Sequence, residues 1–362
     1  MMHLCFSITA HGNGHGAISC AVINRLMTHY PKVKISVMTR LSRDYIASRL
    51  SADFDYYPLG SDFGMLMHSA IEVDIVNSRD KYQQLYERWQ DEVDKEKQLL
   101  KKIKPDILIS NISPISLDAA HQLHIKTASV APFNWAQIYQ AYCLDGQEKS
   151  QAVFQKMQSV YQATNQVFKP LPFVPLDDGR EIAIASINDQ PKADLSSLLT
   201  SLPKGTTKIG LVALGGMPFP LDLQHWPIID GLHWLVDQDI PSSRSDISQI
   251  NELSQSFLQL VASCNFIITK PGYGTYCEIA TIAKYKKIRV MSLLRPDWPE
   301  TPYLNRFLTE RVPFVEVAER QLTGDALKEV LEKLMSKDFP ATLPCEDGAM
   351  QLIERLEGLK ES

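Results

Sequence analysis

The 362-residue sequence predicts an α/β protein with two doubly wound, Rossmann-like domains that face a cleft. Three observations support this fold class. Short apolar runs alternate with segments whose apolar residues recur at helical spacing, which is the pattern of a parallel sheet covered by helices. The alternation restarts after a proline-rich stretch at 170–175. Glycine turns follow three of the expected strands, at the sheet edge where parallel-sheet proteins bind ligands.

The amino-terminal half begins with a βαβ unit. A strand at 4–9 leads into a glycine turn at 12–16, a helix at 17–30 ends before Pro31, and a second strand covers 33–39. The elements expected next are a helix at 43–50, a strand at 54–57, one long amphipathic helix with a solvated charged face at 79–104, a strand at 106–110, a helix at 117–123 and a strand at 127–130.

The carboxy-terminal half repeats this alternation. Strands are expected at 208–214, 266–269, 288–292 and 314–317, and helices at 257–264, from the turn at 271–275 to 283, at 302–311, from 325 and from about 348. We therefore expect a first domain at 1–170, a second at 171–345 and a terminal helix at 346–362 that can cross back to the first domain.

Composition excludes several classes of protein. The 37 basic and 42 acidic side chains give a net charge of −5, which disfavours nucleic acid as a partner. The six cysteines form no CxxC pair and are expected to be reduced thiols, with no disulfide frame or zinc site. No apolar run approaches the roughly 20 residues that span a bilayer, and no signal peptide is expected at the start of the sequence, because residues 1–10 lack a basic region and a cleavage site. A cytoplasmic protein is expected, with peripheral contact at the inner membrane face left open.

The glycine turns are candidate anion sites. Gly12 and Gly14, the pair Gly215-Gly216, and Gly272 with Gly274 all follow expected strands. At such turns the backbone N–H groups at a helix N-terminus bind phosphate. Neither the dinucleotide fingerprint GxGxxG nor the GxxxxGK[ST] loop is present. The alternative explanation for these glycines is that a tight turn between a strand and a helix needs them for its geometry alone.

Two charged residues flank the third turn. Glu278 is expected in the first turn of its helix, where a carboxylate accepts hydrogen bonds from ribose hydroxyls, and Lys270 offsets the charge of a diphosphate. The alternatives are a Glu278 that only stabilises the helix dipole and a Lys270 that is only solvated.

The sequence resembles the GT-B glycosyltransferases, in a branch related to the amino-terminal half of plant arabinokinases and to the peptidoglycan N-acetylglucosaminyltransferase. The resemblance rests on motifs spread over most of the chain. They are Gly12-Asn-Gly-His15, Ile109-Ser-Asn-Ile-Ser-Pro114, Phe133-Asn-Trp135 with Tyr139, Leu214-Gly-Gly216, Lys270-Pro-Gly-Tyr-Gly-Thr275, Glu278 and Arg295-Pro-Asp-Trp-Pro-Glu300 through Leu304-Asn305.

The resemblance implies roles by position. His15 stands where a histidine is the proposed base, on the acceptor-side domain, and Glu278 stands where a glutamate binds the donor ribose. The loops at Gly215-Gly216 and Gly272–Thr275 would hold the diphosphate. Two positions depart from the pattern: Lys270 replaces a histidine, and the Asp-Gln pair that holds donor-sugar hydroxyls is missing. Thr301-Pro302 occupy the nearest register, with Asp297 and Glu300 just upstream.

The function expected is transfer of a hexose-type sugar from a nucleoside-diphosphate sugar, UDP-linked, to an unknown carbohydrate or lipid-linked acceptor. His15 would take the acceptor's proton, with Asp62 or Asp118 as substitute base, and no metal or other cofactor would be required. Trp135 and Tyr139 could stack on an acceptor sugar, with core packing as the alternative. The competing functions are a nucleotide-sugar epimerase or hydrolase, and a sugar-nucleotide-binding protein without turnover.

Overall fold

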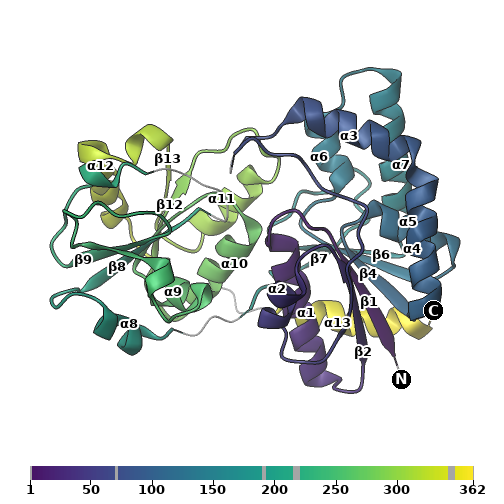
Figure 1. The fold of residues 1–362 in the computed structure, drawn as a ribbon, viewed down its shortest axis with the longest axis horizontal. Helices are drawn as coiled ribbons and strands as arrows, with labels where there is room; N and C mark the ends of the chain where they lie inside the picture. The colour runs from purple at the N-terminus through teal and green to yellow at the C-terminus, as the bar shows by residue number, and fades with distance from the viewer. Residues whose placement is uncertain (1, 70–71, 190–192, 215–220, 341–346, 362) are drawn as a thin grey trace. The chain divides into compact units, whose positions relative to one another are not determined.

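The structure is a computed structural model that describes residues 2–69, 72–189, 193–214, 221–340 and 347–361 (Figure 1). The chain divides into two compact units. Unit 1 contains Met1–His68, Glu72–Asn188 and Glu346–Ser362, and unit 2 contains Ser69–Ile71 and Asp189–Cys345. Each unit has its own parallel sheet with flanking helices, which confirms the predicted class of two Rossmann-like α/β domains. No helix among the described residues is long and apolar enough to cross a membrane.

The sheet of unit 1 has seven parallel strands in the order β3-β2-β1-β4-β5-β6-β7. They are β1 (His3–Ile8), β2 (Lys34–Thr39), β3 (Asp55–Tyr57), β4 (Ile107–Asn111), β5 (Lys126–Val130), β6 (Gln166–Pro170) and β7 (Ile182–Ile184). Strand β1 lies between β2 and β4, and Ile8 is level with both Thr39 and Asn111. The strand order therefore reverses beside β1, and such a switch point opens a crevice at the carboxyl ends of the strands.

The helices of unit 1 are α1 (Gly14–His29), α2 (Arg43–Arg49), α3 (Ile75–Glu87), α4 (Trp89–Ile103), α5 (Pro114–Gln122), α6 (Trp135–Tyr142), α7 (Glu148–Ala163) and α13 (Gly348–Glu361). The single helix predicted over 79–104 is wrong, because the chain leaves helical geometry at Arg88, with φ −109° and ψ 16°. The new helix buries Trp89 against α5, where its indole Nε1 donates to Asp118 Oδ2 at 2.6 Å.

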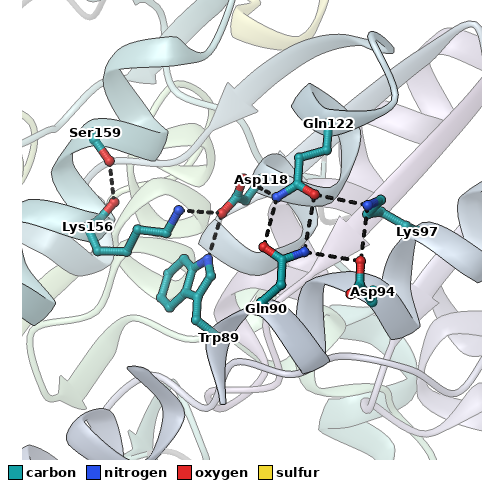
Figure 2. Close-up of polar contacts among 8 residues, drawn as sticks. All are labelled: Trp89, Gln90, Asp94, Lys97, Asp118, Gln122, Lys156 and Ser159. Carbon is teal, nitrogen blue, oxygen red and sulfur yellow. Dashed lines mark hydrogen bonds and ion pairs between the residues drawn. The ribbon is translucent and has the colours of Figure 1, made fainter. Parts of the chain in front are cut away.

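A polar network joins α4 to α5 and α7 (Figure 2). Lys156 of α7 contacts Asp118 Oδ2 at 2.7 Å, and Gln122 Nε2 donates to Asp118 Oδ1 at 3.2 Å. Gln90 and Gln122 bond each other through both amide groups. Burial raises the pKa of Asp118, but the bonds from Lys156 and Trp89 outweigh it and the pKa falls. Asp118 therefore links α4, α5 and α7 through its hydrogen bonds and ion pair, and it is a poor substitute for His15 as a base.

The first sheet continues past the proline-rich stretch. Strand β7 lies beyond position 170 and pairs with β6, with Phe168 level with Ile182. Helix α13 then packs on this unit beside α1 (Figure 1). The backbone N–H of Ala185 donates to Gln351 Oε1 at 2.7 Å, and Arg25 forms an ion pair with Asp347 at 2.8 Å.

The sheet of unit 2 has six parallel strands in the order β10-β9-β8-β11-β12-β13. They are β8 (Lys208–Ala213), β9 (Leu232–Val236), β10 (Ile247–Gln249), β11 (Phe266–Thr269), β12 (Arg289–Leu293) and β13 (Phe314–Val317). The helices are α8 (Leu195–Ser201), α9 (Phe257–Ser263), α10 (Tyr273–Ile282), α11 (Thr301–Thr309) and α12 (Gly324–Met335), with single 3₁₀ turns at Leu223–His225, Ile250–Glu252 and Glu319–Gln321. The strand order again reverses, here between β8 and β11, where Thr269 is level with Ala213.

Candidate functional site

The switch point of unit 1 holds His15 and Asn111. His15 lies in the first turn of α1, directly after the glycine turn, and Asn111 is the last residue of β4. Their side chains meet at 2.8 Å between His15 Nδ1 and Asn111 Oδ1. Burial lowers the pKa of His15 to about 4, and the bond to Asn111 offsets only part of that effect. The imidazole is therefore neutral at physiological pH, as a general base must be before it accepts a proton.

The glycine turn in front of His15 is open. Gly12 and Gly14 are exposed, and no atom lies within 4 Å of the point where a side chain would begin at either residue. Gly12 has φ +63°, a left-handed conformation that suits glycine. Tyr45 closes the outer side of the turn by donating its hydroxyl to the carbonyl of Asn13 at 2.8 Å. The turn leaves its backbone accessible beside a buried histidine.

Aromatic rings surround His15. The ring of Trp135 is 5.6 Å from His15 and 5.2 Å from His11 between centroids, and Phe133 is 5.8 Å from His15. Trp135 and Tyr139 are both 0% exposed, so neither presents a face on which an acceptor sugar could stack. Their predicted role as acceptor residues is wrong in this structure, and the core-packing alternative describes them. Trp135 instead forms part of the wall behind the two histidines.

A buried carboxylate supports this wall. Thr9, just after β1, donates its hydroxyl to Asp62 Oδ2 and accepts a 3.3 Å hydrogen bond from the Trp135 indole Nε1. Burial raises the pKa of Asp62, which is 4% exposed. Asp62 is thus bonded to Thr9 rather than to His15, and its carboxylate helps to fix the position of Trp135.

The switch point of unit 2 holds Lys270. This residue follows β11, and Gly272 is the N-cap of α10, so Gly272, Gly274 and Thr275 form the start of that helix. No atom lies within 4 Å of the point where a side chain of Gly274 would begin. Burial, and then the like charge of Arg295, lower the pKa of Lys270 to about 8. Two cations therefore lie near each other at the positive end of a helix.

Glu278 lies deeper in α10 than the sequence predicted. The helix begins at Tyr273, so Glu278 is in its second turn, and the first turn contains no acidic residue. The carboxylate is 4% exposed. A helix-dipole role needs a carboxylate at the first turn, so the location of Glu278 removes the simple alternative that the sequence left open.

Arg295 and Glu300 lie in the segment that follows β12. The guanidinium of Arg295 stacks on the Trp298 ring, 4.2 Å from its centroid, and the Trp298 indole Nε1 donates to Glu300 Oε2 at 3.3 Å. Glu300 is 3% exposed. Burial and then the charges of Glu300 and Glu278 raise the pKa of the Cys277 thiol, so both carboxylates lie within electrostatic reach of Cys277. Unit 2 thus has one cation after β11 and one after β12, and two carboxylates, Glu278 on α10 and Glu300 before α11, within electrostatic reach of Cys277.

Two sequence candidates cannot be placed. Gly215 and Gly216 lie outside the described residues. Among the residues that the structure describes, no group of three or more His, Cys, Asp or Glu side chains could hold a metal ion.

Comparison with known proteins identifies the fold. No family model matches the chain. The L-arabinokinase of Arabidopsis thaliana is 22% identical over an alignment of 366 positions, which covers 96% of this chain but 33% of that protein. The chain therefore spans about a third of the length of this curated relative.

Solved structures match over nearly the whole chain. The glycosyltransferase of kitacinnamycin has a TM-score of 0.64 at 13% identity, covering 99% of this chain and 94% of that one. MurG of Acinetobacter baumannii has a TM-score of 0.59 at 11% identity, covering 99% and 100%. The chain has the GT-B fold. A structure named as a UDP-N-acetylglucosamine 2-epimerase from Listeria monocytogenes also matches, with a TM-score of 0.57 at 12% identity, covering 100% and 97%.

The GT-B fold gives each unit one switch point, and the candidate residues occupy both. Glycine turns in the sequence mark the positions beside His15, Lys270 and Glu278, and the site roles of these residues stay predictions. No role was assigned from the sequence to Asn111 or Arg295, although both lie in motifs that carried the resemblance. The strand order that brings β4 beside β1 identifies Asn111, and the stacking of Arg295 on Trp298 identifies the second cation.

Proposed function

We propose that this protein is a glycosyltransferase that moves a hexose-type sugar from a UDP-sugar to a hydroxyl of a carbohydrate or lipid-linked acceptor. The observation that supports it best is the charge arrangement in unit 2. Lys270 and Arg295 suit a diphosphate, and the neighbouring carboxylates Glu278 and Glu300 suit sugar hydroxyls. The structural likeness to glycosyltransferases and to MurG supports the same reaction class.

The proposed roles follow from charge and position. Glu278 accepts hydrogen bonds from the ribose, Lys270 and the turn at Gly272–Thr275 hold the diphosphate, and Glu300 faces the donor sugar. Gly12 and Gly14 leave the backbone open beside His15, where a substrate oxygen can approach. We also propose Gly215 and Gly216 as part of the diphosphate loop.

The proposed reaction transfers one proton, forms one bond to the anomeric carbon and breaks another. The acceptor hydroxyl gives its proton to His15 while its oxygen forms a bond to the anomeric carbon of the sugar. The bond between that carbon and the β-phosphate oxygen breaks, and the electron pair leaves with UDP. Lys270 and the backbone N–H groups at the start of α10 stabilise the departing diphosphate, so the proposal needs no metal ion.

We propose that the reaction takes place in the cytoplasm. Five of the six cysteines are described, and these five are buried and form no disulfide with one another, which fits a reducing compartment. A lipid-linked acceptor would bring the protein to the inner membrane face.

The test combines UDP binding with UDP release. Calorimetry should show UDP binding to the wild type, and Glu278→Gln should weaken it by about 1.5–3 kcal/mol, the scale of a hydrogen bond to a charged group. Glu329→Gln, at an exposed position on α12, is the control and should leave the affinity unchanged. Unchanged affinity in a folded Glu278→Gln variant would contradict the ribose role.

UDP release then separates the possible functions. Release that requires an added acceptor supports transfer, and release without one supports the epimerase or hydrolase that the Listeria structure's name raises. Tight binding of UDP-sugars with no release under either condition supports the non-catalytic binding protein. This last function is tested because the Asp-Gln pair that would hold the donor sugar is missing. The residue at the nearest position is Thr301, which is buried.

A further inference from the structure

Three hydrogen bonds fix the side chain of Asn111. Its Oδ1 is 2.8 Å from His15 Nδ1, and its Nδ2 donates to the His15 carbonyl and to Ser19 Oγ, both at 3.2 Å. Asn111 and Ser19 are buried, at 2% and 3% exposure. Both ends of the amide are therefore engaged with α1.

This arrangement decides which way the amide faces. If Asn111 were turned by 180°, its oxygen would face the carbonyl oxygen of His15, and two acceptors would meet in a buried place. The observed orientation avoids that repulsion and presents an acceptor to the His15 ring. Nδ1 must then carry the hydrogen, and the lone pair of the neutral ring lies on Nε2, which has no hydrogen-bond partner among the described residues.

We propose that Asn111 is a positioning residue: it holds His15 in the tautomer whose Nε2 accepts the acceptor's proton, and as a neutral group it gives the imidazolium no countercharge. This inference rests on the proposed function, since it names how the base of that reaction is oriented. A carboxylate in the same place would still accept from the His15 ring and would also stabilise its charged form, but its second oxygen would face the His15 carbonyl in place of a donor.

The surroundings of His15 contain no compensating charge among the described residues. Burial and the bond to Asn111 account for the pKa of about 4, and no charged group contributes. Phe133 approaches the ring from the segment before α6, and Trp135 does so as the first residue of α6. Ser19 lies on the same helix as His15, and the Asp62 carboxylate is bonded to Thr9. His15 is therefore a weak base whose ring stays neutral well below pH 6.

The first experiment reads the tautomer directly in the wild type. Nitrogen NMR of the imidazole rings, with the His15 signals assigned by their loss in His15→Gln, should show a protonated Nδ1 and an unprotonated Nε2 from pH 8 down to about pH 5. A protonated Nε2 in that range would overturn the proposal. This readout needs no substrate, so it stands even if no UDP-sugar is turned over.

The second experiment changes the orienting group. Asn111→Ala should lose the single tautomer and lower turnover by about tenfold or more, because part of the population then presents a hydrogen at Nε2. Asn111→Asp should keep the tautomer, raise the His15 pKa, and move the acid limb of the rate profile upward from near pH 4. If Asn111→Asp does not fold, the nitrogen spectrum of Asn111→Ala remains a complete test.

Asn165→Asp is the matched control. Asn165 precedes β6, at the opposite end of the sheet from the strand ends that hold His15, and its Oδ1 accepts bonds from the Thr127 N–H and hydroxyl that a carboxylate can also accept. This variant should leave the His15 pKa, tautomer and turnover at wild-type values. An equal response to Asn165→Asp, or wild-type spectra and turnover in Asn111→Ala, would show that Asn111 is only structural.

Discussion

Glu96 is a buried carboxylate whose removal should change how stability depends on pH. It lies on α4 at 0% exposure and accepts hydrogen bonds from the Ser61 N–H at 3.1 Å and from the Ser116 hydroxyl. Burial raises its pKa to about 7 from 4.5, and the charge of Asp62 adds to the shift. The folded state therefore binds this proton more tightly than the unfolded chain between pH 4.5 and 7.

The sign and size of the effect follow from that difference. The stability contributed by the proton is present below pH 4.5 and is lost as the pH rises through 7. The difference between a pKa of 4.5 in the unfolded chain and about 7 in the folded state corresponds to about 3 kcal/mol. Glu96→Gln keeps an acceptor for Ser61 without a titrating group, so its free energy of unfolding relative to wild type should rise by up to about 3 kcal/mol between pH 4.5 and 8.

Urea unfolding of both proteins at several pH values measures this difference, and pH effects that the two proteins share cancel. Glu92→Gln is the control on the same helix. Burial raises the pKa of Glu92, but the bonds from Lys95 and Ser61 outweigh it and the pKa is lowered. That variant should gain no stability on going from pH 5 to 8. A Glu96→Gln difference that stays constant over the same range would refute the reasoning.

Two further predictions concern unit 2 and the wall beside His15. Because Lys270 has a pKa of about 8, UDP affinity in the wild type should fall by up to about tenfold per pH unit above pH 8. The Lys270→Arg variant should keep its affinity over the same range, because arginine stays charged. Equal pH profiles of the two proteins in calorimetry would contradict this prediction. Gly64→Ala should destabilise the protein more than Gly146→Ala. Both glycines have positive φ, at +71° and +81°, but a side chain at Gly64 would lie 2.7 Å from the rings of His11 and Trp135, whereas Gly146 has open space. Thermal unfolding measures the two losses, with about 1–2 kcal/mol expected from the left-handed backbone alone.

The sequence predicts the sheet cores of this fold well, because buried parallel strands are short apolar runs between turns. Strand β11 (Phe266–Thr269) and strand β13 (Phe314–Val317) agree with the prediction to the residue. Four strands were not predicted, namely β6, β7, β9 and β10. Strands β7 and β10 have three residues each, and in β6 and β9 a polar residue, Lys169 or His233, interrupts the apolar run. The break at Arg88 was also not predicted, because the local sequence favours a continuous helix and does not indicate that Trp89 packs against α5.

Candidate-site residues that follow a local sequence signal could be predicted, and those that depend on which strands pair could not. A glycine turn after a strand is a local signal, and it located His15 and Lys270. The helical position of Glu278 was wrong by one turn because the helix starts at Tyr273, with Gly272 as its cap. Asn111 is 96 positions from His15, and only the pairing of β4 with β1 brings them together.

The two switch points share a backbone plan but differ in charge, and this difference indicates which substrate each can bind. In unit 2, Lys270 lies just before α10 and Arg295, after β12, is within electrostatic reach of it, so an anion at this helix start is stabilised by charge and by the helix dipole. In unit 1, the strand ends present a neutral His15 whose Nε2 carries a lone pair, and a phosphate oxygen beside that lone pair would be repelled. A neutral hydroxyl can instead donate its hydrogen there. Under the proposed function, the two glycine turns would therefore favour an anionic donor in unit 2 and an uncharged acceptor group in unit 1, and Asn111 would maintain the second condition by fixing where the hydrogen of His15 lies.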